Sequence, residues 1–126
     1  MVRSMVKVNY NNIEGYLNHK VKVHNKRFYD VEGKRADVET LKIVFSRGYF
    51  QAKHQGVEDE KQLLRWGIRR VRYFLYLLRI GYPTQISELY IQEDYELLPK
   101  DHRMYCGYQT FFNTEESFFG DTISNR

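Results

Sequence analysis

The sequence predicts a mainly helical α+β fold: an antiparallel two-helix core with a small N-terminal hairpin, one further short helix and an extended aromatic C-terminal tail. Apolar residues recur at helical spacing in the middle of the chain, and polar and apolar residues alternate near its start. In the last quarter, aromatic residues lie among polar ones without a period. With 126 residues and one cysteine, the chain fits a single small domain, residues 1–126, without an intrachain disulfide.

Residues 1–36 are predicted to form a hairpin or extended arm. Polar and apolar residues alternate from Val6 to Tyr10 and again in residues 19–24. The two residues that follow, an asparagine and a lysine, would form a turn, and residues 28–31 would return as the second strand. Because two strands alone are marginally stable in water, this hairpin would have to pack against helices or a partner.

Residues 37–98 are expected to form the helical core. Asp37 is a good N-cap for a short helix that Gly48 would end. A longer helix follows at residues 57–80, and it begins with three acidic residues, where the helix dipole favours negative charge. A third helix would occupy residues 84–98, between two prolines. The short turn between the last two helices predicts that they pack antiparallel as a two-helix unit.

One side of the helix at residues 57–80 is predicted to be strongly basic. Residues 61–80 carry six basic side chains and no acidic one. At about 100° per residue, four arginines and a tyrosine fall within an arc of roughly 80°, next to a stripe of apolar residues. We call this set the arginine stripe; it consists of Arg65, Arg69, Arg72, Tyr76 and Arg79. Such a surface is typical of binding to a partner or a lipid, not of catalysis.

The sequence leaves the partner of the arginine stripe open. The expected helix at residues 84–98 is acidic, so Glu88, Glu93 and Glu96 can pair with the stripe inside the fold. Otherwise the stripe can face carboxylates of another protein, anionic phospholipid or nucleic-acid phosphates. Five of the six basic side chains are arginines, which favours paired contacts over a diffuse polyanion field.

Residues 99–126 are predicted to be an extended tail. Aromatic residues make up 16% of the chain, and this segment holds several of them among residues too polar for a core. Aromatic side chains on an irregular segment suit contacts with the surface of another protein. The predicted anchors are Tyr105, Tyr108, Phe111, Phe112, Phe118 and Phe119. The lone tryptophan, Trp66, lies among arginines, where it could be a cation–π or stacking platform, but a tryptophan in a helix of a small domain is expected more often in the core.

No catalytic or metal-binding motif stands out in the sequence. His102 and Cys106 are four residues apart, but no second pair of ligands completes a metal site. The acidic run at residues 93–96 lacks the alternating ligands and the glycine of a calcium loop, and no phosphate-binding glycine pattern occurs. We therefore expect a protein that is not an enzyme and has no cofactor, metal or small-molecule substrate.

The targeting signals in the sequence are few. The longest apolar run, Tyr73–Leu78, has six residues, too few to cross a membrane. The first eight residues include two basic side chains and no acidic one, as in a short import signal, and they lack the apolar segment of a secretory signal. The sequence thus predicts a protein that is not secreted and has no transmembrane span.

The end of the basic helix resembles the motif region of the LYR proteins, which are small basic helical accessory subunits and assembly factors of mitochondrial complexes. The resemblance covers residues 69–83. The matching leucine-tyrosine and leucine-arginine pairs are Leu75-Tyr76 and Leu78-Arg79. Leu77 stands where the motif has an arginine, and the segment lies in the middle of the chain. The resemblance implies a subunit on the matrix side of the mitochondrial inner membrane that binds neighbouring proteins, including an acyl-carrier partner.

These observations lead to one functional hypothesis and one alternative. The first is a non-catalytic accessory subunit, or scaffold, of a large membrane-associated assembly such as a mitochondrial respiratory-chain complex. Its partners would be other protein subunits and anionic phospholipid. The alternative is a nucleic-acid-associated protein, either a ribosomal accessory or a viral factor, that binds phosphates through the arginine stripe. The sequence leaves open which complex is involved and whether the isolated chain folds.

Overall fold

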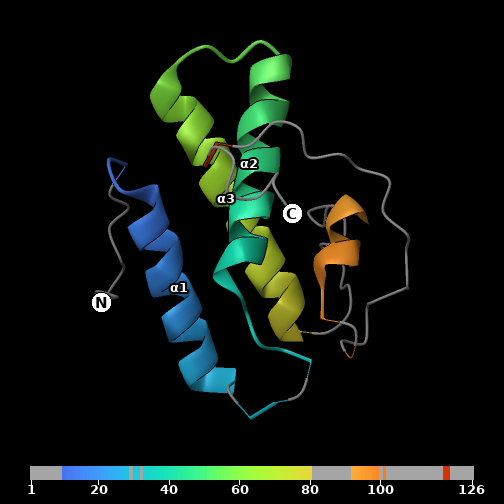
Figure 1. Ribbon diagram of the computed structural model, residues 1–126. Coiled ribbons are helices and arrows are strands. Elements are labelled where there is room, and N and C mark those ends of the chain that lie inside the picture. The colour runs from blue at the N-terminus through green and yellow to red at the C-terminus, as the bar shows by residue number, and fades with distance from the viewer. Residues whose placement is uncertain are drawn as a thin grey trace, which may run out of the picture.

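The protein is described here from a computed structural model, which describes residues 10–28, 30–31, 33–80, 92–99, 101 and 118–119. Three α-helices and one 3₁₀ helix form the described fold (Figure 1). Their bounds are Ile13–Phe28 for α1, Val38–His54 for α2, Glu60–Ile80 for α3 and Gln92–Leu97 for η2. In Figure 1, α2 and α3 cross at the centre, with α1 on one side and η2 on the other. The fold is therefore mainly helical, as predicted.

The predicted N-terminal hairpin is wrong, because the residues assigned to its first strand and turn lie within α1. Asn12 starts this helix: its side-chain Oδ1 accepts a hydrogen bond of 2.9 Å from the Gly15 N–H. The buried side chains follow a helical period and are Ile13, Tyr16, Leu17 and His24. The alternation at residues 19–24 was misleading, since Val23 is 50% exposed. The short alternation of polar and apolar residues is part of the longer helical pattern of α1.

The connection from α1 to α2 is tied back to α1 by side chains. Asn25 donates to the Ala36 carbonyl at 2.9 Å and accepts from the Ala36 N–H at 2.7 Å. The His24 ring lies 2.7 Å from the Lys34 carbonyl oxygen, measured from Nε2. Lys34 in turn donates to the carbonyl of Arg79 at the end of α3. These contacts satisfy polar groups of an irregular segment and fix where α2 begins.

The N-terminus of α2 confirms the predicted cap, and its C-terminus corrects the predicted stop. The Asp37 side chain accepts hydrogen bonds from the N–H and the hydroxyl of Thr40, at 3.1 and 3.0 Å. The helix continues through Gly48 to His54. Gly48 allows α2 and α3 to approach closely, because a Cβ at this position would lie 2.7 Å from the Trp66 carbonyl oxygen of α3. The turn comes later, at Gly56, whose φ is +103°.

The basic helix forms as predicted, but its main neighbour is different. Asp59 precedes α3, and its carboxylate accepts from the Gln62 N–H at 3.1 Å. The most extensive packing of α3 is against α2, not against a helix at residues 84–98. Residues 81–91 lie outside the described part of the chain, and residues 92–97 form the 3₁₀ helix η2. The predicted two-helix unit is thus replaced by the pair α2 and α3.

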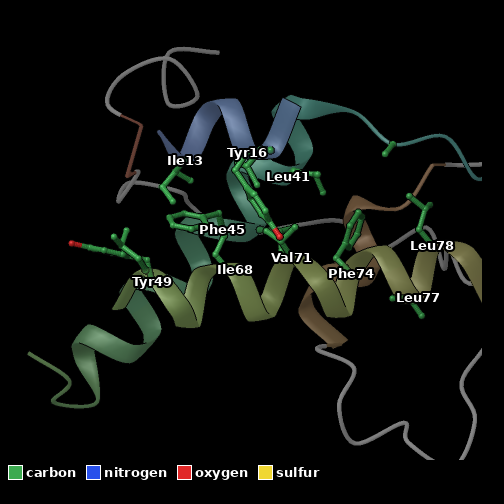
Figure 2. Packing of buried hydrophobic residues seen from close by; sticks show 14 of the residues in the cluster. Ile13, Tyr16, Leu41, Phe45, Tyr49, Ile68, Val71, Phe74, Leu77 and Leu78 are labelled. Carbon is green, nitrogen blue, oxygen red and sulfur yellow. The ribbon is translucent and has the colours of Figure 1, made fainter. Parts of the chain in front are cut away.

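The core lies where all three helices meet (Figure 2). Gly67 makes room for it, because a Cβ there would lie 2.6 Å from the ring of Phe45. The largest fully buried side chains are Leu17, Leu41, Val44, Phe45, Val71, Leu77 and Leu78. Within the described residues, no helix has the length and apolar character needed to span a membrane.

Two of the six predicted tail anchors pack on the protein's own core. The Phe118 ring lies 5.1 Å from that of Phe45 and 5.0 Å from that of Tyr49, between centroids. Its N–H donates to the buried hydroxyl of Ser46 at 3.0 Å. Phe119 packs beside Phe45 as well. The other four anchors lie outside the described residues: Tyr105, Tyr108, Phe111 and Phe112.

Candidate binding face on α3

All four arginines of the arginine stripe have exposed side chains on α3. The opposite side of the helix is buried, with Val71, Phe74 and Leu78 in the core. Tyr76 is half-buried, and the guanidinium of Arg79 lies 4.9 Å from the centre of its ring. The predicted polarity of this helix is therefore correct.

A fifth arginine of α3, Arg70, has an entirely different environment. Its side chain is buried and forms a two-pronged contact with Asp94 of η2, with N···O distances of 3.0 and 3.2 Å. It also donates to the Gln51 amide oxygen at 2.9 Å. Arg47 of α2 binds the same carboxylate at 2.9 Å and the Glu96 carboxylate at 2.6 Å. Two arginines and two carboxylates thus join η2 to α2 and α3.

This buried network bears on the internal pairing that the sequence allowed. Glu96 binds Arg47, not the arginine stripe. Glu88 and the side chain of Glu93 lie outside the described part of the chain. Among the residues that the structure describes, no carboxylate forms an ion pair with any arginine of the stripe. The positive charge of the stripe is therefore not neutralised within the described fold.

Three of the stripe arginines line one open pocket of about 590 Å³. Arg79 is not among its lining residues and lies farther along α3. Trp66, which was expected in the core, is 43% exposed and lines this pocket. The complete lining consists of Tyr10, Gln62, Arg65, Trp66, Ile68, Arg69, Arg72 and Tyr73. We call this the arginine pocket.

The guanidinium of Arg69 is held by two aromatic side chains. It lies 5.2 Å from the centre of the Trp66 ring and 5.9 Å from that of Tyr73. Its Nε–H also donates to the Tyr73 hydroxyl at 2.9 Å. Cation–π contacts and this hydrogen bond restrict the side chain, so less entropy is lost when it binds a ligand.

Arg72 connects the arginine pocket to α1. Its positive charge acts on Tyr16 of α1, and the Lys20 ammonium lies 5.8 Å from the centre of the Tyr16 ring. Burial raises the pKa of Tyr16, while Arg72 partly offsets this rise. The pKa of Lys20 is lowered, first by burial and then by the positive charge of Arg72. Two cations therefore repel each other at this junction.

The lining suits binding of an anion more than acid–base chemistry. Of the described residues that line the arginine pocket, none is a carboxylate, a histidine or a cysteine. Arginines remain charged at all ordinary pH values, so they neither donate nor accept protons in a reaction. In the described part of the chain, no cluster of metal-ligating side chains occurs.

The aromatic half of the pocket was not predicted as a site, because Trp66 was considered as a stacking platform but assigned to the core; the spacing of the helix residues does carry a signal for it. Gln62, Trp66, Arg69 and Tyr73 are spaced by four, three and four residues, which places them on one helix face. That row runs beside the arginine stripe and shares Arg69 with it. Tyr10 gave no such signal, because it reaches the pocket from the segment before α1.

Comparisons with known proteins add no relative from which a role could be taken. No family model matches the chain, and neither the curated proteins nor the solved structures yield a significant match.

Proposed function

We propose that this protein is a non-catalytic accessory subunit of a large assembly and that the arginine stripe is its binding face. The observation that carries this proposal is the contrast between arginines of the same helix. Arg70 is buried and paired with Asp94, whereas the four stripe arginines are exposed and unpaired with any described carboxylate. Exposed arginines at regular spacing offer planar forks to the carboxylates or phosphates of a partner.

The partners in this proposal are acidic protein subunits, with anionic phospholipid as a further contact. Four aromatic residues of the tail would contact neighbouring subunits: Tyr105, Tyr108, Phe111 and Phe112. Phe118 and Phe119 are left out of this role, because they pack on α2. A place at the matrix side of the mitochondrial inner membrane, within a respiratory-chain complex, is supported only by the local resemblance to LYR proteins and by the basic start of the chain.

The test is a purification of the tagged protein from its native cells, in mild detergent and after nuclease treatment. The wild type should bring down a fixed set of membrane-complex subunits in stoichiometric amounts. A variant with glutamine at the four stripe arginines should lose them. A matched control removes the same charge from other exposed positions of α1 and α2: Lys22, Lys26, Arg27 and Lys53. Equal loss in both variants would show that net charge, not the stripe, holds the protein in place.

A second candidate function, binding to nucleic acid, is favoured by the exposed Trp66 ring beside the arginines. Aromatic rings next to basic side chains are the usual means of binding single strands, because bases stack on the rings while cations follow the phosphates. This alternative predicts that affinity for a single-stranded oligonucleotide falls steeply with salt. Each stripe arginine replaced by glutamine should lower the slope of log K against log salt by about one unit. An association that does not respond to salt would exclude this role.

A further inference from the structure

We propose that the arginine pocket binds a nucleotide-type ligand, that is, an organic phosphate that carries a planar ring. This goes beyond an accessory role, which needs only an exposed basic face along all of α3. It concerns one discrete site with its own lining, and Arg79 has no part in it.

The phosphate half of the inference rests on the three arginines of the pocket. With a rise of about 1.5 Å per residue, the seven-residue interval from Arg65 to Arg72 covers about 10 Å along the helix, with Arg69 between them. A row of guanidinium groups over this distance suits a chain of two phosphates, since each group can bind an oxyanion through two parallel hydrogen bonds. No described lining residue carries a negative charge that would compete.

The ring half rests on the size and the aromatic lining of the pocket. A volume of about 590 Å³ is far larger than a bare phosphate needs, and it lies within the ordinary range of small-molecule sites. Trp66, Tyr73 and Tyr10 form the apolar part of the lining with Ile68. The indole of Trp66 is 43% exposed, so a planar ring can stack on it without unfolding of the helix.

The charges around the pocket give a further reason why an anion should bind. Lys20 and Arg72 meet at Tyr16 without a described carboxylate between them. The repulsion between these two cations contributes to the lowered pKa of Lys20. An anion beside Arg72 would relieve this repulsion, so binding should stabilise the folded chain as well as fill the pocket.

The chain offers a direct optical readout, because Trp66 is its only tryptophan. The full-length protein is titrated with ADP at constant ionic strength, while the fluorescence of Trp66 is recorded with excitation at the red edge of its absorption. We expect saturable quenching. Arg65→Gln and Arg72→Gln should each weaken ADP binding about tenfold or more, as expected for loss of a charge-assisted hydrogen bond. The matched control Arg79→Gln removes the same charge from the same stripe and should leave ADP affinity unchanged.

Two further arms test the ring and the source of the phosphate. Calorimetry should show ADP binding at least about tenfold tighter than inorganic pyrophosphate, and Trp66→Ala should remove that advantage. A single strand of ten thymidine nucleotides carries the same chemical groups, phosphates and planar rings, in a polymer. If that strand binds while ADP does not, the pocket is part of a nucleic-acid surface and the inference is overturned.

The remaining outcomes are equally decisive. If pyrophosphate bound as tightly as ADP, the planar ring would make no contribution and that half of the proposal would be refuted. If no saturable binding occurred up to millimolar ADP, the pocket would not be a nucleotide-type site. An Arg79→Gln effect as large as that of Arg65→Gln would show that ADP responds to the charge of the whole stripe. None of these results would affect the accessory-subunit proposal, which is tested by the native purification. Loss of partners in that purification would likewise leave the ADP result intact.

Discussion

At the scale of single residues, two adjacent arginines of α3 lie in different environments, one at the surface and one in the interior. Arg69 faces the arginine pocket and Arg70 faces Asp94, because a step of about 100° turns the next side chain toward the interior. The helical spacing correctly places Arg70 outside the stripe. It did not identify Asp94 as the partner, since the contact joins residues 24 positions apart and depends on where η2 docks.

The substitution Asp94→Asn should be strongly destabilising. It removes the charge of the buried carboxylate that Arg70 contacts at 3.0 Å and that Arg47 contacts at 2.9 Å. Breaking a buried ion pair from one side typically costs about 3–5 kcal/mol. Urea unfolding of the purified chain measures this change. The control Arg65→Gln, at an exposed position, should alter the free energy of unfolding by less than about 0.5 kcal/mol; a similar effect of both changes would contradict the buried network.

His24 should make stability depend on pH below neutrality. Burial lowers the pKa of this imidazole, and nearby cations, Arg79 first, lower it further, while the hydrogen bond to the Lys34 carbonyl acts in the opposite direction. As the pH falls through the usual histidine value, the unfolded chain takes up the proton before the folded one does. The contribution of His24 to the free energy of unfolding should therefore be complete near pH 7 and should decrease toward pH 5.

Denaturant unfolding at a series of pH values tests this dependence. His24→Gln should reduce the slope between about pH 7 and pH 5, because the titrating group is gone while a donor to the Lys34 carbonyl remains. His19→Gln, which removes a histidine from an exposed position of the same helix, is the matched control. Identical slopes in all three proteins would rule out His24 as the source.

At the scale of elements, two glycines allow α2 and α3 to approach closely. Gly48 faces the backbone of α3, and Gly67 faces the ring of Phe45. The sequence suggested a helix stop at Gly48, because glycine is common just after helix ends. Whether a glycine ends a helix or makes room for a neighbour depends on the packing partner, which a local pattern does not contain.

Alanine at Gly48 should destabilise the protein, although alanine is by about 1 kcal/mol the better helix former. The added methyl would lie 2.7 Å from a backbone oxygen and 3.0 Å from the Gly67 Cα, neither of which can move without shifting α3. Overpacking of this kind costs about 1–3 kcal/mol. A lower thermal midpoint of Gly48→Ala would agree with the close crossing, and a higher one would contradict it.

The element-scale predictions from sequence were good where a long helical period or a cap was present. The Asp37 cap and the whole of the basic helix could be predicted, since their signals are local. The hairpin was a wrong prediction, because six alternating residues also fit inside the helical period of α1. A local pattern also could not predict which helix packs against α3. Its apolar stripe shows that a neighbour exists, but nothing in the stripe specifies α2.

At the scale of the whole molecule, two residues near the C-terminus pack on core residues in the first half of the chain. Phe118 and Phe119 reach Phe45 and Tyr49 of α2 from far along the chain, and the Lys42 ammonium lies 5.5 Å from the centre of the Phe119 ring. The sequence predicted aromatic anchors in this tail and assigned all of them to partners. Composition identified the anchors, but composition cannot distinguish a surface of the same chain from a surface of another.

The tail anchors should separate into two groups by their effect on stability. The double change Phe118→Ala and Phe119→Ala should lower the free energy of unfolding of the isolated chain by about 2–4 kcal/mol, below the sum for two fully buried rings because both are half-buried. The matched change Phe111→Ala and Phe112→Ala should leave that value unaltered and should reduce recovery of partner subunits. Calorimetry of the purified variants measures the first effect. Equal destabilisation by both pairs would mean that the second pair serves the core as well.

The close crossing of α2 and α3 also bears on how this protein can change over evolutionary time. Gly48 and Gly67 allow the close approach of α2 and α3 on the buried side of α3, away from the exposed arginine stripe. Substitutions at these exposed positions should cost little in folding free energy compared with substitutions in the core. After a gene duplication, one copy could acquire a new partner through its surface while both copies keep the same interior, and such lineages would diverge in specificity before they diverge in structure.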